Sequence, residues 1–200
     1  MYDHLVSDLA AFVLAGGQST RMGSDKAFVE LNGQTLLLRA LALVTAITPQ
    51  VGIVGDRKKF SAFAPVVEDV YPEHGPLGGV HAALSSSKAE LNLVLAVDLP
   101  FVELKFLDYL IAQARDCDAT VTVPRTGGGW QPLCAMYRRG FADVAEPALI
   151  AGNNKIDLLF AKVKIRVLEH TELLQSGFAD SMFRNLNTPQ ELESARRVSR

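Results

Sequence analysis

Residues 11–26 read AFVLAGGQSTRMGSDK, a short apolar run followed at once by glycines, hydroxyls and two cations. The apolar run 11–15 does not alternate with polar residues, which is typical of a strand buried on both faces of a parallel sheet. The loop that follows would leave the carboxyl edge of the sheet, where open α/β sheets bind their ligands. Gly16 and Gly17 permit positive φ angles and a close backbone approach, so successive N–H groups can point at phosphate oxygens. The segment predicts a phosphate-binding loop.

The glycine spacing excludes two common types of phosphate-binding loop, and the cations support binding of phosphate. Arg21 and Lys26 supply two full positive charges. A dinucleotide-binding loop needs G-x-G-x-x-G and a P-loop needs G-x-x-x-x-G-K-[ST]. Here five residues separate Gly17 from Gly23, and Lys26 follows three residues after Gly23, so neither template fits. A plain tight turn after the strand is the alternative interpretation of the glycines.

Composition describes an ordinary globular domain over residues 1–200. Of the 200 residues, 48% are hydrophobic and 21% are charged, which is sufficient for a full core. The formal net charge of −2 gives no basic footprint for nucleic acid. The start of the chain lacks the regions of a secretory signal, and no apolar stretch is long enough to span a membrane. Cys117 and Cys134 match no metal or redox spacing, and free cysteines are common in the cytoplasm. Together these features favour a cytoplasmic protein without nucleic-acid or membrane partners.

Apolar runs of strand length alternate with helical patterns along the chain. This alternation predicts a three-layer, Rossmann-like α/β fold with a mainly parallel sheet. Gly127–Gly129 interrupts the pattern as a flexible elbow, and the strand after it returns antiparallel to the one before. Strands are expected at 11–15, 51–54, 65–68, 91–97, 119–123, 131–137 and 164–168, and helices near 35–47, 78–88, 103–115, 140–151, 154–162 and from 188 onward.

Asp98 follows directly after the apolar run 91–97. A carboxylate at the carboxyl end of a buried strand projects into the same crevice as the loop at 16–26, and it is costly there unless a cation compensates it. Mg²⁺ is a natural partner, because proteins hold it by one or two carboxylates together with substrate phosphates. The alternative is that Asp98 caps the next helix or forms a local salt bridge.

Two further segments carry polar groups at predicted strand ends. Residues 68–80 lead from a strand into a Gly/Pro loop and a helix N-terminus, which favours an anion; a turn with a helix cap explains the same residues. Asn185 and Asn187 lie at positions i and i+2 of an extended segment, so both amides face the same side and can contact a phosphate edge. Asx turns before a helix explain these amides nearly as well.

The loop resembles the signature of nucleotidyltransferases, and specifically that of the molybdenum cofactor guanylyltransferase family, whose members read L-A-G-G-x-S-x-R-M-G-x-D-K. Related cytidylyl and sugar-nucleotide enzymes more often carry L-A-A-G and a proline before the lysine, where this chain has Gly17 and Asp25. The family's C-D-x-P-F, Asp with G-P-L-x-G, and N-[VIL]-N-T-P segments are similar to residues 97–101, 69–79 and 185–189.

The chain departs from the family at two places. Val97 and Leu99 differ from the C-D-x-P-F pattern, although its aspartate and proline are kept, and residues 55–57 read Gly-Asp-Arg where the family commonly offers an asparagine to the nucleotide. The resemblance implies three catalytic residues, Arg21, Lys26 and Asp98, with Asp98 as the metal ligand. It implies nucleotide binding by Leu14, Ala15, Gly16, Gly17, Lys26, Asp69 and Asp98, and second-substrate binding by Gly75, Gly79, Asn185 and Asn187.

The activity implied by the resemblance is transfer of GMP from GTP to the phosphate of molybdenum-bound molybdopterin, with Mg²⁺ as cofactor. The products would be molybdopterin guanine dinucleotide and pyrophosphate, and proteins that deliver molybdopterin would be transient partners. Two alternatives remain open at this point: a cytidylyl or sugar-phosphate nucleotidyltransferase of the same fold, and a nucleotide-binding module without turnover.

Overall fold

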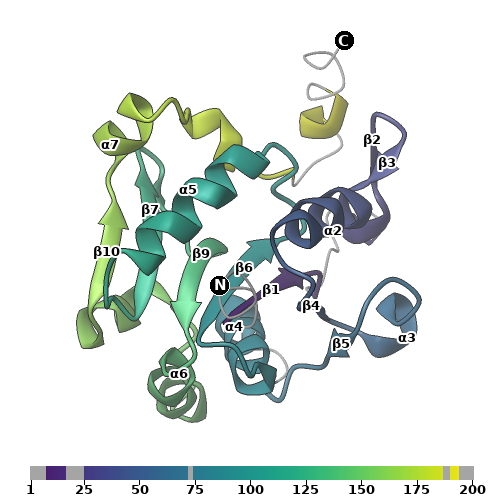
Figure 1. The fold of residues 1–200 in the computed structure, drawn as a ribbon. Coiled ribbons are helices and arrows are strands. Elements are labelled where there is room, and N and C mark those ends of the chain that lie inside the picture. The colour runs from purple at the N-terminus through teal and green to yellow at the C-terminus, as the bar shows by residue number, and fades with distance from the viewer. Residues whose placement is uncertain (1–7, 17–24, 72–73, 187–189, 194–200) are drawn as a thin grey trace.

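The computed structural model describes residues 8–16, 25–71, 74–186 and 190–193. Within these residues the strands form an eight-stranded sheet in the order β10-β7-β9-β6-β1-β4-β5, with β8 paired to β7 (Figure 1). All strands of the main path run parallel except β9, which is antiparallel to both β6 and β7. The strands are β1 (Leu9–Leu14), β4 (Val51–Val54), β5 (Val66–Val67), β6 (Leu91–Ala96), β7 (Val121–Thr126), β8 (Gly129–Trp130), β9 (Cys134–Arg138) and β10 (Ile165–Leu168).

Helices cover both faces of this sheet. One face carries α2 (Leu36–Ile47), α5 (Leu104–Arg115) and α7 (His170–Gln175), and the other carries α4 (Gly75–Ser86) and α6 (Phe141–Ile150) (Figure 1). Shorter elements are α3 (Arg57–Phe60) and the 3₁₀ turns η1 (Lys26–Phe28), η2 (Asp157–Lys162) and η3 (Asp180–Phe183). The predicted three-layer, mainly parallel, Rossmann-like fold is confirmed.

The interior strand β1 shows why the sheet is buried on both sides. Leu9, Ala11 and Val13 pack in the core under α2 and α5, whereas Ala10 and Phe12 pack in the core under α4 and α6. Because successive side chains of a strand point to opposite faces, a run without polar residues supplies both cores at once.

Several predicted boundaries differ from the observed ones. β1 begins at Leu9, two residues before the predicted run, and α4 begins at Gly75 rather than at 78. The predicted helix 154–162 is instead the 3₁₀ turn η2. The helix expected from 188 has residues 190–193 in helical conformation, and its predicted start lies outside the described residues.

A small hairpin and the short helices α3 and α7 were not predicted. β2 (Glu30–Leu31) and β3 (Gln34–Thr35) pair antiparallel around Asn32 and Gly33, which have φ angles of 54° and 77°. Two consecutive positive φ angles match a type I′ hairpin turn, for which Asn-Gly is the favoured dipeptide. Thr35 then caps α2, accepting a hydrogen bond from the Leu38 N–H at 3.3 Å.

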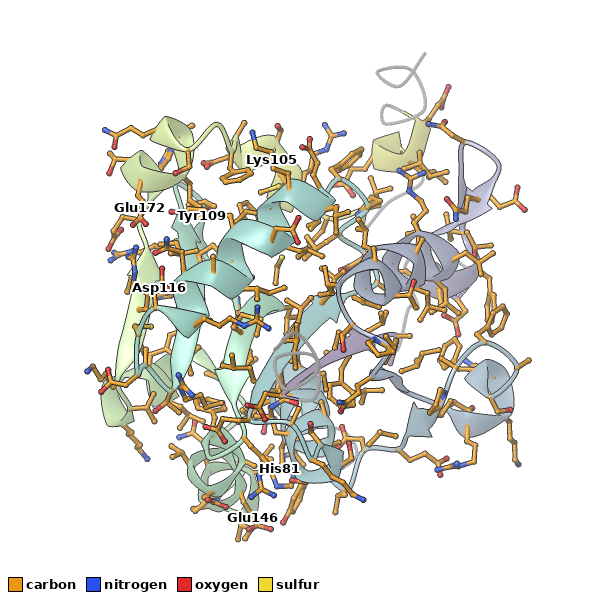
Figure 2. All side chains as sticks on the ribbon, in the orientation of Figure 1. His81, Lys105, Tyr109, Asp116, Glu146 and Glu172 are labelled. Atoms are coloured by element: carbon orange, nitrogen blue, oxygen red, sulfur yellow. The ribbon has the colours of Figure 1, made fainter. Side chains whose placement is uncertain are left out.

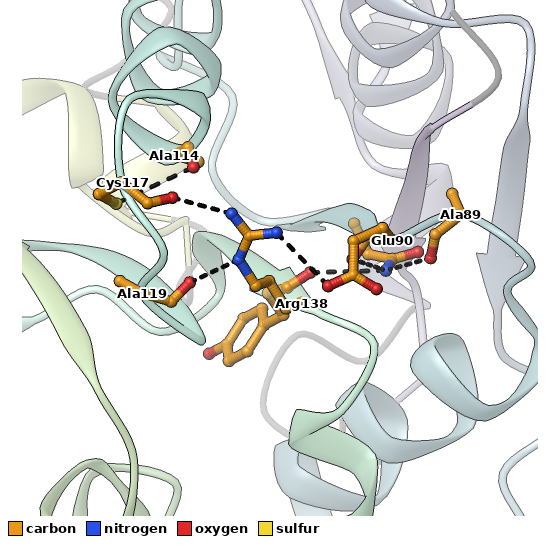
Figure 3. Close-up of polar contacts among 8 residues, drawn as sticks. Ala89, Glu90, Ala114, Cys117, Ala119 and Arg138 are labelled. Atoms are coloured by element: carbon orange, nitrogen blue, oxygen red, sulfur yellow. Dashed lines mark hydrogen bonds and ion pairs between the residues drawn. The ribbon is translucent and has the colours of Figure 1, made fainter. Parts of the chain in front are cut away.

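Arg138 closes the amino edge of the sheet at the end of β9. Its guanidinium donates to the carbonyls of Ala119 and Cys117 at 3.0 and 2.8 Å and lies 3.4 Å from the Glu90 carboxylate (Figure 3). These contacts tie the loop before β7 to β9. They lie at the edge opposite to the predicted site.

The carboxyl edge gathers the ends of the central strands. Leu14 of β1 lies in register with Val54 of β4 and Ala96 of β6. Because β9 runs in the opposite direction, the chain enters β9 at this same edge, and the Leu133 carbonyl accepts a hydrogen bond from the Ala96 N–H at 2.7 Å. Among the described residues, no helix is long and apolar enough to cross a membrane.

Candidate active site

Lys26 and Asp98 meet at the carboxyl edge. The Nζ atom of Lys26 donates to Oδ2 of Asp98 at 3.1 Å, and both side chains are about four-fifths buried, with exposed fractions of 20% and 19%. The two residues belong to segments far apart in the sequence, so the fold itself brings the cation of the glycine loop to the carboxylate of β6. The site combines one positive and one negative group at the place where sheets of this class bind ligands.

The turn after β6 positions Asp98. The Val97 N–H donates to the Leu14 carbonyl at 3.0 Å, and the Leu99 N–H donates to the Ala96 carbonyl at 3.3 Å. The Asp98 carbonyl accepts from the Leu186 N–H at 3.1 Å, so the C-terminal segment also lies against this turn. The alternative interpretation of Asp98 as a helix cap is wrong, because Glu103 occupies the N-cap position of α5, and the salt bridge of Asp98 is not local, because Lys26 lies 72 residues away.

Lys26 is placed by the 3₁₀ turn η1. The Asp25 side chain caps this turn by accepting from the Ala27 N–H at 3.2 Å, and it also accepts from Lys59 at 2.8 Å. The hydrogen bond and charge of Asp25 raise the pKa of the exposed Lys59 amine. This capping role accounts for an aspartate directly before Lys26, because it fixes the turn that carries the lysine.

The backbone of the glycine loop differs from the prediction at its start. The N–H groups of Ala15 and Gly16 both donate to the Val54 carbonyl, at 3.0 and 3.1 Å, so they extend the sheet toward β4 and do not point at a phosphate. Gly16 is also absent from the described glycines with positive φ. The predicted positive φ and phosphate-directed N–H are wrong for Gly16. Gly17 and Arg21 lie outside the described residues.

Asp69 follows β5 and packs against the first turn of α4. Its carboxylate accepts from the Tyr71 N–H at 2.8 Å, and partial burial raises the pKa of this carboxyl. A Cβ atom on Gly78 would lie only 2.6 Å from Oδ2 of Asp69, so a glycine is required where the helix passes the carboxylate. The structure thus places Asp69 beside the N-terminal turn of α4, and its binding of a nucleotide stays a prediction.

The two glycines predicted to bind the second substrate have different environments. Gly75 starts α4 with a φ of +61° and has open space around its Cα, so its conformation explains its identity. Gly79 is buried, and a Cβ atom there would lie 2.8 Å from the Leu14 side chain. Gly79 therefore serves close packing between α4 and β1.

Asn185 is exposed beside the turn of Asp98, because it directly precedes Leu186. This places Asn185 at the same edge as Lys26 and Asp98. Asn187 lies outside the described residues. In place of the family asparagine near Gly55, Asp56 caps α3 by accepting from the Lys58 N–H at 2.8 Å.

A cavity of about 420 Å³ opens beside this edge and was not predicted. It lies between the start of α4, the β7–β8 hairpin and the region of η2. Leu133 in its wall accepts the hydrogen bond from Ala96, two residues before Asp98, so the wall is bonded to the end of β6. The lining residues are Pro76, Gly129, Trp130, Pro132, Leu133, Asn154, Ile156 and Asp157. The sequence held one signal, the single tryptophan of the chain in a glycine-rich turn.

Comparisons with known proteins agree with this geometry. Residues 11–166 match the family model described as "MobA-like NTP transferase domain". The chain is 34% identical over 193 residues to the molybdenum cofactor guanylyltransferase of Vibrio cholerae, covering 93% of this chain and 90% of the relative.

Two solved structures share the fold. Molybdopterin-guanine dinucleotide biosynthesis protein A from Archaeoglobus fulgidus superposes with a TM-score of 0.83 at 26% identity, covering 95% of this chain and 98% of that one. A CMP:2-keto-3-deoxy-manno-octonic acid synthetase, at 14% identity with a TM-score of 0.76 and coverage of 96% and 98%, shares the fold alone. The family match covers both the glycine loop and the Asp98 turn, and the chain belongs to the MobA-like NTP transferase domain family.

Proposed function

We propose that this nucleotidyltransferase transfers GMP from GTP to the terminal phosphate of molybdenum-bound molybdopterin. An oxygen of that phosphate attacks the α-phosphorus of GTP, the bond from the α-phosphorus to the bridging oxygen breaks, and pyrophosphate leaves. The single observation that carries the proposal is the Lys26–Asp98 pair, 3.1 Å apart at the ligand edge of the sheet. Its support is the 34% identity to the Vibrio cholerae guanylyltransferase over 93% of the chain.

The protein groups act by position and charge. The attacking phosphate is already an anion, so no side chain needs to remove a proton. Lys26 would neutralise negative charge that accumulates on the triphosphate and on the leaving pyrophosphate, with Arg21 as a second cation from the same loop. The backbone at Leu14 and Ala15 would border the base and ribose.

Asp98 is the residue that fits Mg²⁺. Carboxylate oxygens are preferred magnesium ligands, and among the described residues only Lys26 donates to this carboxylate. None of these residues donates to the other oxygen, Oδ1. We propose that Oδ1 binds the metal, which the substrate phosphates would bind as well. Bound Mg²⁺ would supply charge neutralisation between these phosphates.

The second substrate is assigned to the cavity beside the Asp98 turn. A volume of about 420 Å³ lies in the ordinary range of small-molecule sites. Trp130 offers an aromatic surface to the pterin rings, and Asp157 at the rim can accept from a pterin amino group. The predicted acceptor residue Asn185 directly precedes Leu186, whose N–H donates to the Asp98 carbonyl, and we propose that it contacts the acceptor phosphate. A protein that delivers molybdopterin would make a transient contact at this cavity. We propose the cytoplasm as the compartment of the enzyme.

Pyrophosphate release with purified molybdopterin and each nucleoside triphosphate in Mg²⁺ tests the function. We expect turnover with GTP and a preference over CTP of roughly 10- to 200-fold, the range for a methyl-sized steric difference. The reason is Gly17, where cytidylyl relatives carry alanine, and Gly17→Ala should therefore weaken GTP binding. Equal or better use of CTP would contradict the assignment as a guanylyltransferase. If no nucleotide gives pyrophosphate, the proposed nucleotidyltransferase activity is wrong.

A further inference from the structure

We propose that residues Ala179–Leu186, called the strap here, fix the acceptor cavity and the Asp98 turn relative to each other. Asp180 and Arg184 are the positioning residues toward its two ends. The naming of the two substrate sites rests on the proposed function. The contacts of the strap do not.

One end of the strap holds the β7–β8 hairpin. Oδ2 of Asp180 accepts from the Gly127 N–H at 3.1 Å, and Oδ1 lies 3.6 Å from Nε2 of His170. A Cβ atom on Gly127 would lie 3.2 Å from Oδ2 of Asp180, so the strap touches the tip of the hairpin. The predicted flexible elbow at 127–129 is thus a tight hairpin with an external anchor.

The anchored hairpin forms a wall of the cavity. Gly129 and Trp130 of β8 both line it. The Trp130 ring packs edge-on against Phe160 with centroids 5.2 Å apart, and the Arg125 guanidinium lies 5.1 Å from its centroid. A shift of the hairpin tip therefore changes the aromatic surface offered to the acceptor.

The other end of the strap holds the turn after β6. The Leu186 N–H donates to the Asp98 carbonyl at 3.1 Å. The Arg184 guanidinium lies 4.8 Å from the centroid of the Phe101 ring, three residues beyond Asp98. Backbone and side chain thus both fix the turn that presents the Asp98 carboxylate.

The middle of the strap is rigid because the core holds it. Met182 and Phe183 are each 6% exposed, and Leu186 is fully buried. The Phe183 ring packs edge-on against Phe106 of α5 with centroids 5.2 Å apart. Close-packed segments transmit displacements between their ends. In the sheet β9 lies between β6 and β7 and pairs with both, so the strap is a second connection between the hairpin and the Asp98 turn, in addition to β9.

The hairpin end is tested by Asp180→Ala and Asp180→Asn. Trp130 is the single tryptophan, so acrylamide quenching of protein fluorescence reports on the cavity wall. Asp180→Ala should increase quenching clearly and raise the KM for molybdopterin about 10-fold, the size expected for one charge-assisted hydrogen bond, with GTP affinity unchanged. Asp180→Asn should restore both values, because its amide oxygen still accepts from the Gly127 N–H.

Glu172→Gln is the control, since the Glu172 carboxylate bonds to Arg166 and Tyr109 and, among the described residues, to none of the β7–β8 hairpin. Quenching and KM should remain those of the wild type in this variant. If Asp180→Ala changes neither quantity, or if Glu172→Gln changes both equally, the strap has no positioning role. Quenching is measured without substrates, so a failure of the proposed function appears instead as absent turnover in the wild type.

The second end is tested by Arg184→Ala alone and together with Asp180→Ala. Arg184→Ala should lower kcat several-fold with little effect on the KM for molybdopterin, because it acts on the turn of Asp98. If the strap joins the two sites, the effects of the double variant on kcat/KM should deviate from the product of the single effects. Independent effects would overturn the coupling.

Discussion

Two partly buried ion pairs of this molecule, Arg166–Glu172 and Lys26–Asp98, differ in how many hydrogen bonds the protein donates to the carboxylate. Arg166 and Glu172 join β10 to α7, and the Glu172 carboxylate also accepts from the Tyr109 hydroxyl at 2.8 Å (Figure 2). Arg166 donates in addition to Gln113 at 2.6 Å. By contrast, among the described residues the Asp98 carboxylate receives one donor, Lys26.

The two pairs have similar partial burial but different chemistry. The exposed fractions are 32% and 30% for Arg166 and Glu172, against 20% and 19% for Lys26 and Asp98. The Arg166 hydrogen bonds lower the pKa of the Glu172 carboxyl, and Glu172 raises the pKa of Arg166. The Glu172 oxygens are all used by bonds that stabilise the fold, whereas the Asp98 carboxylate has one donor among the described residues and lies at the edge for which we propose substrate and metal binding.

Asp98→Asn should have the largest effect on activity. The substitution keeps shape and removes the charge that the proposed metal needs, so turnover should fall by at least about 100-fold. Thermal stability should stay close to that of the wild type. Steady-state kinetics at saturating Mg²⁺ measure this effect. Near-normal turnover of Asp98→Asn would show that the Asp98 charge is not needed for catalysis.

Lys26→Ala should weaken binding of the triphosphate. Charge-assisted contacts to phosphate contribute about 1.5–3 kcal/mol, which corresponds to roughly 10- to 150-fold in the Kd for GTP. Guanosine should bind as before, since it lacks the phosphates. Lys59→Ala, which removes the exposed partner of Asp25, is the control and should change little. Calorimetric titration showing wild-type GTP affinity in Lys26→Ala would contradict the assignment.

Glu172→Gln should affect stability and leave catalysis unchanged. Loss of the charge beside Arg166 should lower the free energy of unfolding by about 1–2 kcal/mol at neutral pH. Because the folded-state pKa of Glu172 is lowered, this contribution is present above the unfolded pKa and is lost as pH falls through the lowered value. Denaturant titrations across pH test it. Glu68→Gln, in an exposed pair with Arg57, is the control with little expected effect.

Asp69→Asn should give the smallest change and the opposite sign. Burial raises the pKa of Asp69, so the ionised carboxylate costs stability at neutral pH and the variant should gain less than about 1 kcal/mol. The wild type should recover this difference as pH falls through the raised pKa. Urea unfolding at neutral and acidic pH measures it, and a variant that is less stable at neutral pH would contradict the desolvation argument.

The sequence was sufficient to predict a mainly parallel sheet and the edge at which Lys26 and Asp98 meet. Apolar runs at 11–15 and 91–97 correspond to β1 and β6, and the antiparallel return of 131–137 is confirmed in β9. Asp98 and Lys26 were placed at one edge because parallel strands end together. The hairpin at Asn32-Gly33 was missed although its dipeptide is a strong local signal.

Other features depend on contacts that no local pattern contains. Gly16 was expected to face a phosphate, but its N–H completes a backbone hydrogen bond to β4. The helix α7 has six residues, too few to show helical periodicity. The contact of Asp180 with Gly127 joins residues 53 positions apart, and only the packed fold defines it.

The hydrogen bond from Leu186 to Asp98 has a consequence for synthesis of the chain. A ribosome delivers Lys26 and Asp98 early, whereas Leu186 emerges after every strand of the described sheet. Because N-terminal parts fold first during translation, nascent chains can assemble the sheet while the turn of the proposed metal ligand still lacks its last backbone partner. A chain that ends before Leu186 would therefore contain every strand of the described sheet but an incomplete edge at Asp98, so nucleotide turnover would depend on the last segment to be synthesised.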